Sequence, residues 1–242
     1  MKKFLQNHIS LLVAVSSGAL VLLLRLCHLD TMNEAGLLAS GHITGILAGI
    51  LTLLIPAILL WRSLVLPKDS ECRFPTSLPA AVGYGAGALG VATTGAQFLL
   101  QSPDNLLMIC GFVGLVAAVA LVMIASMRMQ GQRSNVLHHG VVCLFFMLLL
   151  ICQYRMWSAQ SQLQLFGCGL LATVCLMVSA YHRACFDGKM GQLRMFSFFR
   201  SVGIFFCLAA IPGSEFWLLY LSGAVWSIAD LLNLSLEPQE GG

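Results

Sequence analysis

The sequence predicts an all-α, polytopic integral membrane helix bundle with about eight transmembrane helices and no soluble domain. Three observations predict this class: 58% of the 242 residues are hydrophobic, only 10% are charged, and the mean hydropathy is +0.87. A soluble globular domain carries roughly 25% charged residues. The composition therefore excludes an ordinary cytoplasmic enzyme, and we expect a single transmembrane domain over residues 1–242.

Eight apolar runs are long enough to cross a bilayer, because a spanning helix needs about 20 residues. They cover residues 8–27, 36–60, 78–100, 105–126, 136–153, 162–181, 195–211 and 215–234. The first run has no convincing small-residue cleavage site, so we interpret it as a retained span and not as a signal peptide. Pro56 lies inside the second run, where it removes a backbone hydrogen bond and predicts a kink.

The last two spans are divided by Pro212 and Gly213. An uninterrupted helix from Met195 to Leu234 would measure about 60 Å, roughly twice the thickness of the hydrocarbon layer. We therefore predict a hairpin turn at these two residues.

The distribution of Lys and Arg predicts how the spans are oriented, because these residues are held on the cytoplasmic side during insertion. With both termini in the cytoplasm, Arg25 and Arg155 fall outside and Arg200 falls within a span. The inner set comprises Lys2, Lys3, Arg62, Lys68, Arg73, Arg128, Arg133, Arg183, Lys189 and Arg194. We predict a multi-pass protein of the cell membrane with both termini cytoplasmic.

Two ionisable residues in the last two spans are predicted to form a buried ion pair. Arg200 lies six residues beyond Arg194, and Asp230 lies seven residues before Glu237, so both sit about 10 Å from the same side of the membrane. Pairing would lower the cost of burying either charge. In the alternative, Arg200 extends to the headgroups and Asp230 reaches interfacial water. A pair would more readily serve structure than catalysis.

A second polar group is predicted at the outer ends of the first two spans. Its members are Arg25, His28, Asp30, Glu34 and His42. Imidazole and carboxylate groups bind cations or relay protons near neutral pH, so these residues are candidates for an outward-facing polar pocket lined by His42. In the alternative they are solvated loop charges, with one histidine bonded to a neighbouring helix.

Small residues recur along two spans: Gly41, Gly45 and Gly49 in the second, and Gly83, Gly87 and Gly95 in the third. Such stripes let helix backbones approach closely. They predict packing within the bundle, or else an interface with a second copy or with another membrane protein.

The sequence contains no catalytic motif, and we assign no catalytic residue, no metal site and no cofactor. His138, His139, His182 and Cys185 could approach one another at the cytoplasmic side, but adjacent histidines diverge on a helix. The nine cysteines include no CxxC spacing, and most of them lie within apolar runs.

Three functions remain open, and in all of them the lipid bilayer is the surrounding partner and no nucleic acid is expected. The kinked second span, the glycine-rich third span and the buried charges favour a transporter or permease for a small solute or ion. Short loops and the scarcity of polar groups at the midplane favour a non-catalytic subunit or scaffold that binds a partner through a helix face. An intramembrane enzyme has no catalytic pair to support it.

Overall fold

A computed structural model describes residues 2–29, 43–66, 72–73, 77–101, 104–132, 134–158, 163–188 and 190–236. The all-α class is confirmed, with eight helices in these ranges. They are α1 (Lys2–Leu29), α2 (Ile43–Leu64), α3 (Leu78–Gln101), α4 (Asn105–Met129), α5 (Val136–Trp157), α6 (Leu163–Asp187), α7 (Leu193–Ala210) and α8 (Trp217–Leu232). Two short strands, β1 (Cys72–Arg73) and β2 (Ser235–Leu236), pair in antiparallel fashion.

Six of these helices are long and apolar enough to cross a membrane: α1, α2, α4, α5, α6 and α7. The chain is therefore a multi-pass membrane protein. The other two helices fall short for different reasons. Helix α8 has only 16 residues, whereas α3 has 24 residues but many glycines and two threonines, which lower its hydropathy.

Four helices continue at least three residues past the apolar runs that predicted them. Helix α2 ends at Leu64, α4 at Met129, α5 at Trp157 and α6 at Asp187, which is three to six residues beyond the expected ends. The extensions carry Arg128, Arg183 and Asp187, so charged residues that the sequence placed in loops belong to helices.

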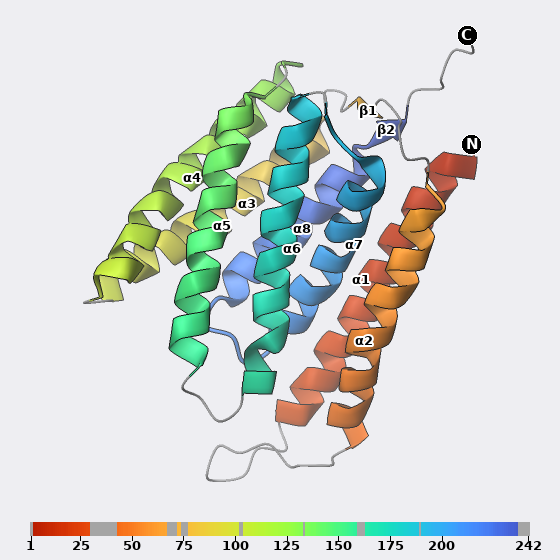
Figure 1. The fold of residues 1–242 in the computed structure, drawn as a ribbon, viewed down its shortest axis with the longest axis vertical. Coiled ribbons are helices and arrows are strands. Elements are labelled where there is room, and N and C mark those ends of the chain that lie inside the picture. The colour runs from red at the N-terminus through yellow and green to blue at the C-terminus, as the bar shows by residue number, and fades with distance from the viewer. Residues whose placement is uncertain are drawn as a thin grey trace.

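Consecutive helices run up and down, so that α1, α3, α5 and α7 all begin at the end of the bundle that also holds β1 and β2 (Figure 1). Because Arg62, Arg128, Arg183 and Arg194 lie near this end, we call it the basic end. Between α7 and α8 the chain turns at Pro212 and Gly213, and Gly213 adopts the left-handed φ of 71°.

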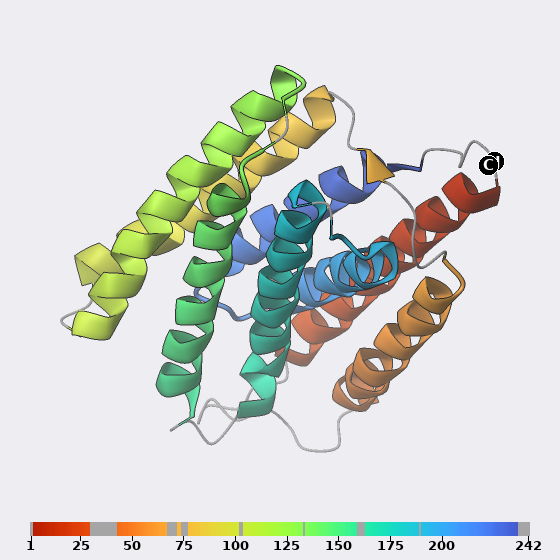
Figure 2. The same ribbon diagram turned by 45° about the horizontal axis from the view of Figure 1, so that its top comes forward.

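Helices α3 to α8 form a closed arrangement that we call the helix ring. Each packs against the next in chain order, and α8 packs against α3 to complete the circuit. The α1–α2 hairpin lies outside the ring, with both of its helices against α7. Figure 2 shows α3 and α4 side by side and inclined to α5 and α6.

The inside of the helix ring is filled by aromatic side chains that meet both across the ring and between neighbouring helices. Trp226 of α8 stacks on Phe146 of α5, with 6.3 Å between ring centroids. Trp226 also packs against Tyr84 of α3 at 5.6 Å. These contacts place the aromatic core of the bundle at the centre of the helix ring.

The glycines of α3 allow this helix to pack closely against other helices of the same chain. A Cβ atom on Gly83 would lie 2.2 Å from Cβ of Ala229 in α8, and one on Gly95 would lie 2.9 Å from the carbonyl oxygen of Gly111 in α4. In α2, Gly45 faces the imidazole of His28, whereas a Cβ on Gly49 would meet nothing within 4 Å. Gly41 lies outside the described residues.

Candidate functional site

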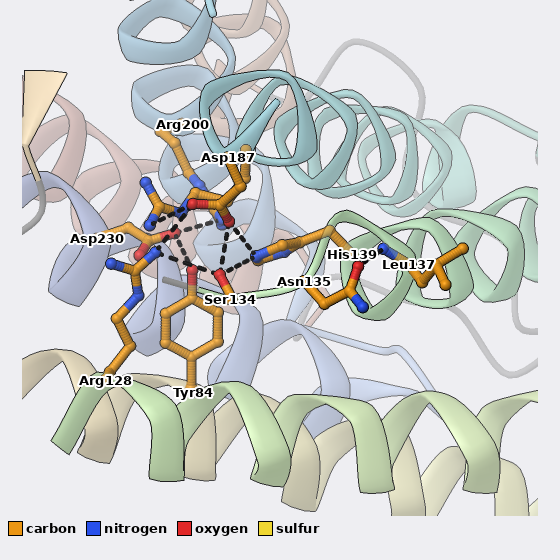
Figure 3. A network of polar contacts seen from close by, with 10 residues as sticks. Tyr84, Arg128, Ser134, Asn135, Leu137, His139, Asp187, Arg200 and Asp230 are labelled. Carbon is orange, nitrogen blue, oxygen red and sulfur yellow. Dashed lines mark hydrogen bonds and ion pairs between the residues drawn. The ribbon is translucent and has the colours of Figure 1, made fainter. Parts of the chain in front are cut away.

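The first of two charged clusters in the helix ring surrounds Asp230, and we call it the Asp230 cluster. Arg200 Nη2 lies 2.5 Å from Asp230 Oδ2 in an ion pair. Arg200 Nη1 donates to Ser227 Oγ at 3.2 Å, and the Tyr84 hydroxyl donates to Asp230 Oδ2 at 3.4 Å (Figure 3). Arg200 is 0% and Asp230 2% exposed. The two residues therefore meet at a common depth inside the bundle.

Aromatic side chains hold the Arg200 guanidinium in place. Its central carbon lies 4.2 Å from the ring centroid of Trp226 and 5.6 Å from that of Phe196. A guanidinium over an aromatic face is attracted by the ring quadrupole, and more strongly when water is excluded. Arg200 is thus held by two aromatic rings as well as by the Asp230 carboxylate.

The second group, the Asp187 cluster, lies closer to the basic end. Asp187 Oδ2 accepts a hydrogen bond from Ser134 Oγ at 2.5 Å and lies 3.1 Å from His139 Nε2. Asp187 Oδ1 lies 3.6 Å from Arg128 Nη2 and 3.8 Å from Arg183 Nη2. In Figure 3 the side chains of Arg128, Ser134 and His139 converge on the region around the Asp187 carboxylate.

Local structure explains how these residues converge. Asn135 caps α5, its side chain accepting a hydrogen bond from the Leu137 backbone N–H, and this cap sets Ser134 directly above the start of the helix. Arg183 and Asp187 are one helical turn apart on α6 and share a face. Ser134 also accepts a hydrogen bond from Arg128 Nη2 at 3.4 Å, which ties the end of α4 to the start of α5.

Ser134, His139 and Asp187 are residue types of a hydrolytic triad, but their geometry differs from one. In a triad the serine and the aspartate engage opposite nitrogens of the imidazole. Here both Ser134 Oγ and Asp187 Oδ2 approach Nε2, at 3.0 and 3.1 Å. Ser134 also donates directly to the carboxylate. The three side chains therefore meet around the Asp187 carboxylate and not in the order of a triad.

The two clusters form one network to which every helix of the ring contributes. Tyr84 joins them, because its ring lies edge-on to His139 with centroids 6.2 Å apart while its hydroxyl reaches Asp230. The contributing residues are Tyr84 (α3), Arg128 (α4), His139 (α5), Arg183 and Asp187 (α6), Arg200 (α7) and Asp230 (α8). Three arginines and two aspartates give one net positive charge when His139 is neutral.

An uncharged polar cluster occupies the opposite half of the helix ring. Gln153 Nε2 donates to the Tyr220 hydroxyl at 2.9 Å, and Thr173 Oγ1 lies 2.9 Å from Gln153 Oε1. All three side chains are 0% exposed. They connect α5, α6 and α8 in the same way that the charged network does at the basic end.

The predicted outer pocket is described only in part, because Asp30, Glu34 and His42 lie outside the described residues. The other two members face different helices. Arg25 Nη1 donates to the backbone oxygen of Ala209 in α7 at 2.7 Å. His28 Nδ1 lies 3.4 Å from Thr44 Oγ1 in α2. Each therefore contacts a neighbouring helix, and the pocket itself stays a prediction.

Two cavities lie away from the charged network. One, of about 200 Å³, is lined by Asp104, Leu106, Leu107, Cys152, Arg155 and Met156 at the end opposite the basic end. The other, of about 10 Å³, lies beside Trp157, Phe166 and the turn at Pro212. Among the described residues, no group of three or more His, Cys, Asp or Glu side chains is placed to hold a metal ion.

The sequence singled out Arg200 and Asp230 but not the rest of the network. The sequence predicts Arg128 and Arg183 as cytoplasmic charges outside the spans. It offers His139 only as a poorly placed metal ligand, and it predicts no role for Asp187. One signal was available: Arg183 and Asp187 are spaced i, i+4, which is the spacing of a helical ion pair. That spacing becomes informative only once the helix is known to continue past residue 181.

Comparisons of the chain with protein-family models, with curated proteins and with solved structures found no match.

Proposed function

We propose that this multi-pass protein is a permease-like transporter of the cell membrane for a small solute or ion, with the helix ring as its pathway and the basic end in the cytoplasm. The observation that carries the proposal is the charged network. Six helices each contribute a polar side chain to one buried cluster that contains both signs of charge. Ionisable residues inside a membrane bundle are costly, and they typically mark solute or ion pathways.

The network would act as a gate at the basic end. Ion pairs between helices can open without chemical change, because each charge can exchange its protein partner for water or for a solute. Arg200 and Asp230 join α7 to α8, while Asp187 joins α6 to α4 and α5. Separating these contacts would let the helices move apart, as alternating access requires. The cavities described above lie elsewhere, which fits a closed conformation.

A non-catalytic scaffold is the second candidate, and α2 favours it. This helix packs only against α1 and α7 among the described contacts. It exposes large apolar side chains along its length, among them Leu53 at 79% and Trp61 at 75%. A helix of a partner membrane protein could cover this face. In a scaffold the helix ring would stay closed.

Chemical accessibility of the pathway separates the two functions without knowledge of the solute. Ser227→Cys places a thiol beside Arg200 inside the helix ring. Val225→Cys lies two residues away on the same helix but points to the outer surface, where its side chain is 38% exposed. Each variant would be treated in membranes with a charged, membrane-impermeant thiol reagent from either side, and modification would be read by peptide mass spectrometry.

A transporter predicts that Ser227→Cys is modified from at least one side, more slowly than a thiol at the exposed residue Ser158. Val225→Cys should stay unmodified, because lipid suppresses thiolate formation and excludes a charged reagent. If Ser227→Cys is as inert as Val225→Cys while Ser158→Cys reacts, the interior does not open and the scaffold is the better description.

A further inference from the structure

We infer that the groups around Asp187 form a binding site for a soluble oxyanion, a carboxylate or phosphate group on a small molecule, and that the Asp187 carboxylate occupies this site in the closed state. We call the four surrounding groups, Arg128, Ser134, His139 and Arg183, the oxyanion cradle. That the anion is the transported solute rests on the proposed function. That the cradle binds an oxyanion does not depend on transport.

The geometry of the cradle matches two oxygens of one oxyanion. One oxygen of Asp187 receives the Ser134 hydroxyl at 2.5 Å and faces His139 Nε2 at 3.1 Å. The other faces the guanidinium groups of Arg128 and Arg183 at 3.6 and 3.8 Å. The last two distances exceed the usual 2.7–3.2 Å range of an N–H···O bond. The arginines therefore hold the present carboxylate by charge more than by direct hydrogen bonds.

Charge identifies the class of ligand. Without Asp187, the cradle holds two guanidinium groups and no carboxylate, within a site where Arg183 is 0% and Arg128 5% exposed. Arginine presents rigid, paired N–H donors that fit carboxylate and phosphate oxygens and has no acceptor with which to bind a cation. The start of α5 lies beside the site, and the positive end of a helix dipole also favours an anion.

Asp187 is placed so that it can leave the cradle. It is the last residue of α6 and is followed directly by Gly188, so its side chain lies at the very end of the helix. A carboxylate at the negative end of a helix dipole is unfavourable, and the cradle offsets this cost. Asp187 and Ser134 remain 7% and 5% exposed, which puts the site within reach of solute from the basic end.

The experiment removes the Asp187 carboxylate and supplies a soluble oxyanion in its place. Asp187→Ala would be purified and placed in phosphatidylcholine nanodiscs, and its thermal midpoint measured with sodium acetate, sodium phosphate or sodium chloride at equal ionic strength. We expect acetate or phosphate, but not chloride, to raise the midpoint by about 5 to 10 °C near 100 times its Kd. Asp104→Ala removes an exposed aspartate paired with Arg155 at the opposite end, and should show no such recovery.

Arg128→Gln combined with Asp187→Ala tests whether the recovery occurs at the cradle, and should abolish it. If Asp187→Ala does not fold, the wild-type protein is titrated with phosphate beside Arg128→Gln, and a midpoint rise confined to the wild type is expected. Equal midpoints in all three salts, or a recovery that survives loss of Arg128, would overturn the site.

A lipid headgroup carries the same phosphate chemistry, so a further arm uses nanodiscs containing phosphatidylglycerol without soluble phosphate or acetate. Stabilisation of Asp187→Ala by this lipid, with no added effect of phosphate, would overturn a soluble ligand. These readouts measure binding. If Ser227→Cys is not modified but oxyanions stabilise Asp187→Ala, transport is rejected and the oxyanion site is retained. If Ser227→Cys is modified but oxyanions do not stabilise Asp187→Ala, the oxyanion site is rejected and transport is retained.

Discussion

At the scale of single residues, the buried charges of the network lie beside charges of opposite sign. Asp230 shows this most clearly, because its carboxylate meets a guanidinium, and a phenol donates to the same oxygen. The central carbon of the Arg200 guanidinium in turn lies 4.2 Å from the ring centroid of Trp226. A lysine could supply the positive charge, but it has neither the paired N–H donors of a guanidinium nor a planar group that packs on an aromatic ring. The pair therefore depends on residue type as well as on charge.

Breaking the buried pair on one side should be costly, because the remaining charge stays in a dry site. We expect Arg200→Met or Asp230→Asn to lower the free energy of unfolding by about 3 to 5 kcal/mol. The exposed pair offers a matched control: Arg155→Met should cost about 1 kcal/mol or less. Thermal midpoints in detergent and folded yield would measure both effects. The exchange Arg200→Asp with Asp230→Arg should recover part of the yield, because the two sites are coupled.

The uncharged cluster supports a second residue-scale prediction. Tyr220→Phe removes the hydroxyl that accepts from Gln153 and leaves a fully buried amide without that partner. An unsatisfied buried donor costs about 1 to 3 kcal/mol. Tyr154→Phe, at a side chain that is 61% exposed, should change stability little. Equal midpoints for the two variants would contradict the importance of this cluster.

At the scale of elements, apolar length predicted where helices run but not where they end. The segments that became α3, α7 and α8 were predicted to within two residues, because lipid-facing and core-facing residues are both apolar. The ends of α4 and α6 could not be predicted in this way. A buried arginine at the last turn of a helix is indistinguishable, in one sequence, from a solvated arginine in the following loop. The charged network was missed for this reason.

The packing of α3 gives a prediction with an internal control. Gly83→Ala would bring a methyl group into the Cβ of Ala229, which cannot rotate away, and overpacking of this kind costs about 1 to 3 kcal/mol. Gly85→Ala, two residues along the same helix, meets nothing within 4 Å. That variant should be neutral or gain up to about 1 kcal/mol from helix propensity. A Gly83→Ala protein as stable as Gly85→Ala would show that α3 and α8 are not in this close contact.

At the scale of the whole molecule, the helix ring and its outer hairpin form a bundle with opposite ends that differ in charge. The start of α1 and strand β2 lie at the basic end, which puts both ends of the described chain on one side (Figure 1). The excess of Lys and Arg there predicts a cytoplasmic orientation. Reporter domains fused at residue 1 and at residue 242 should both be active in the cytoplasm. A fusion active outside the cell at either end would reject the eight-span topology.

If the helix ring opens around its charged network, the environment of Trp226 must change. Trp226 packs against Tyr84, Phe146 and Arg200 at the centre of the ring. With 5-fluorotryptophan in place of the four tryptophans, the ¹⁹F resonance of Trp226 can be assigned by its loss in Trp226→Phe. In lipid nanodiscs we expect two Trp226 resonances, or exchange broadening on the microsecond to millisecond scale, while Trp61 on the outer face gives one sharp line. A single sharp Trp226 line without relaxation dispersion would contradict an opening pathway.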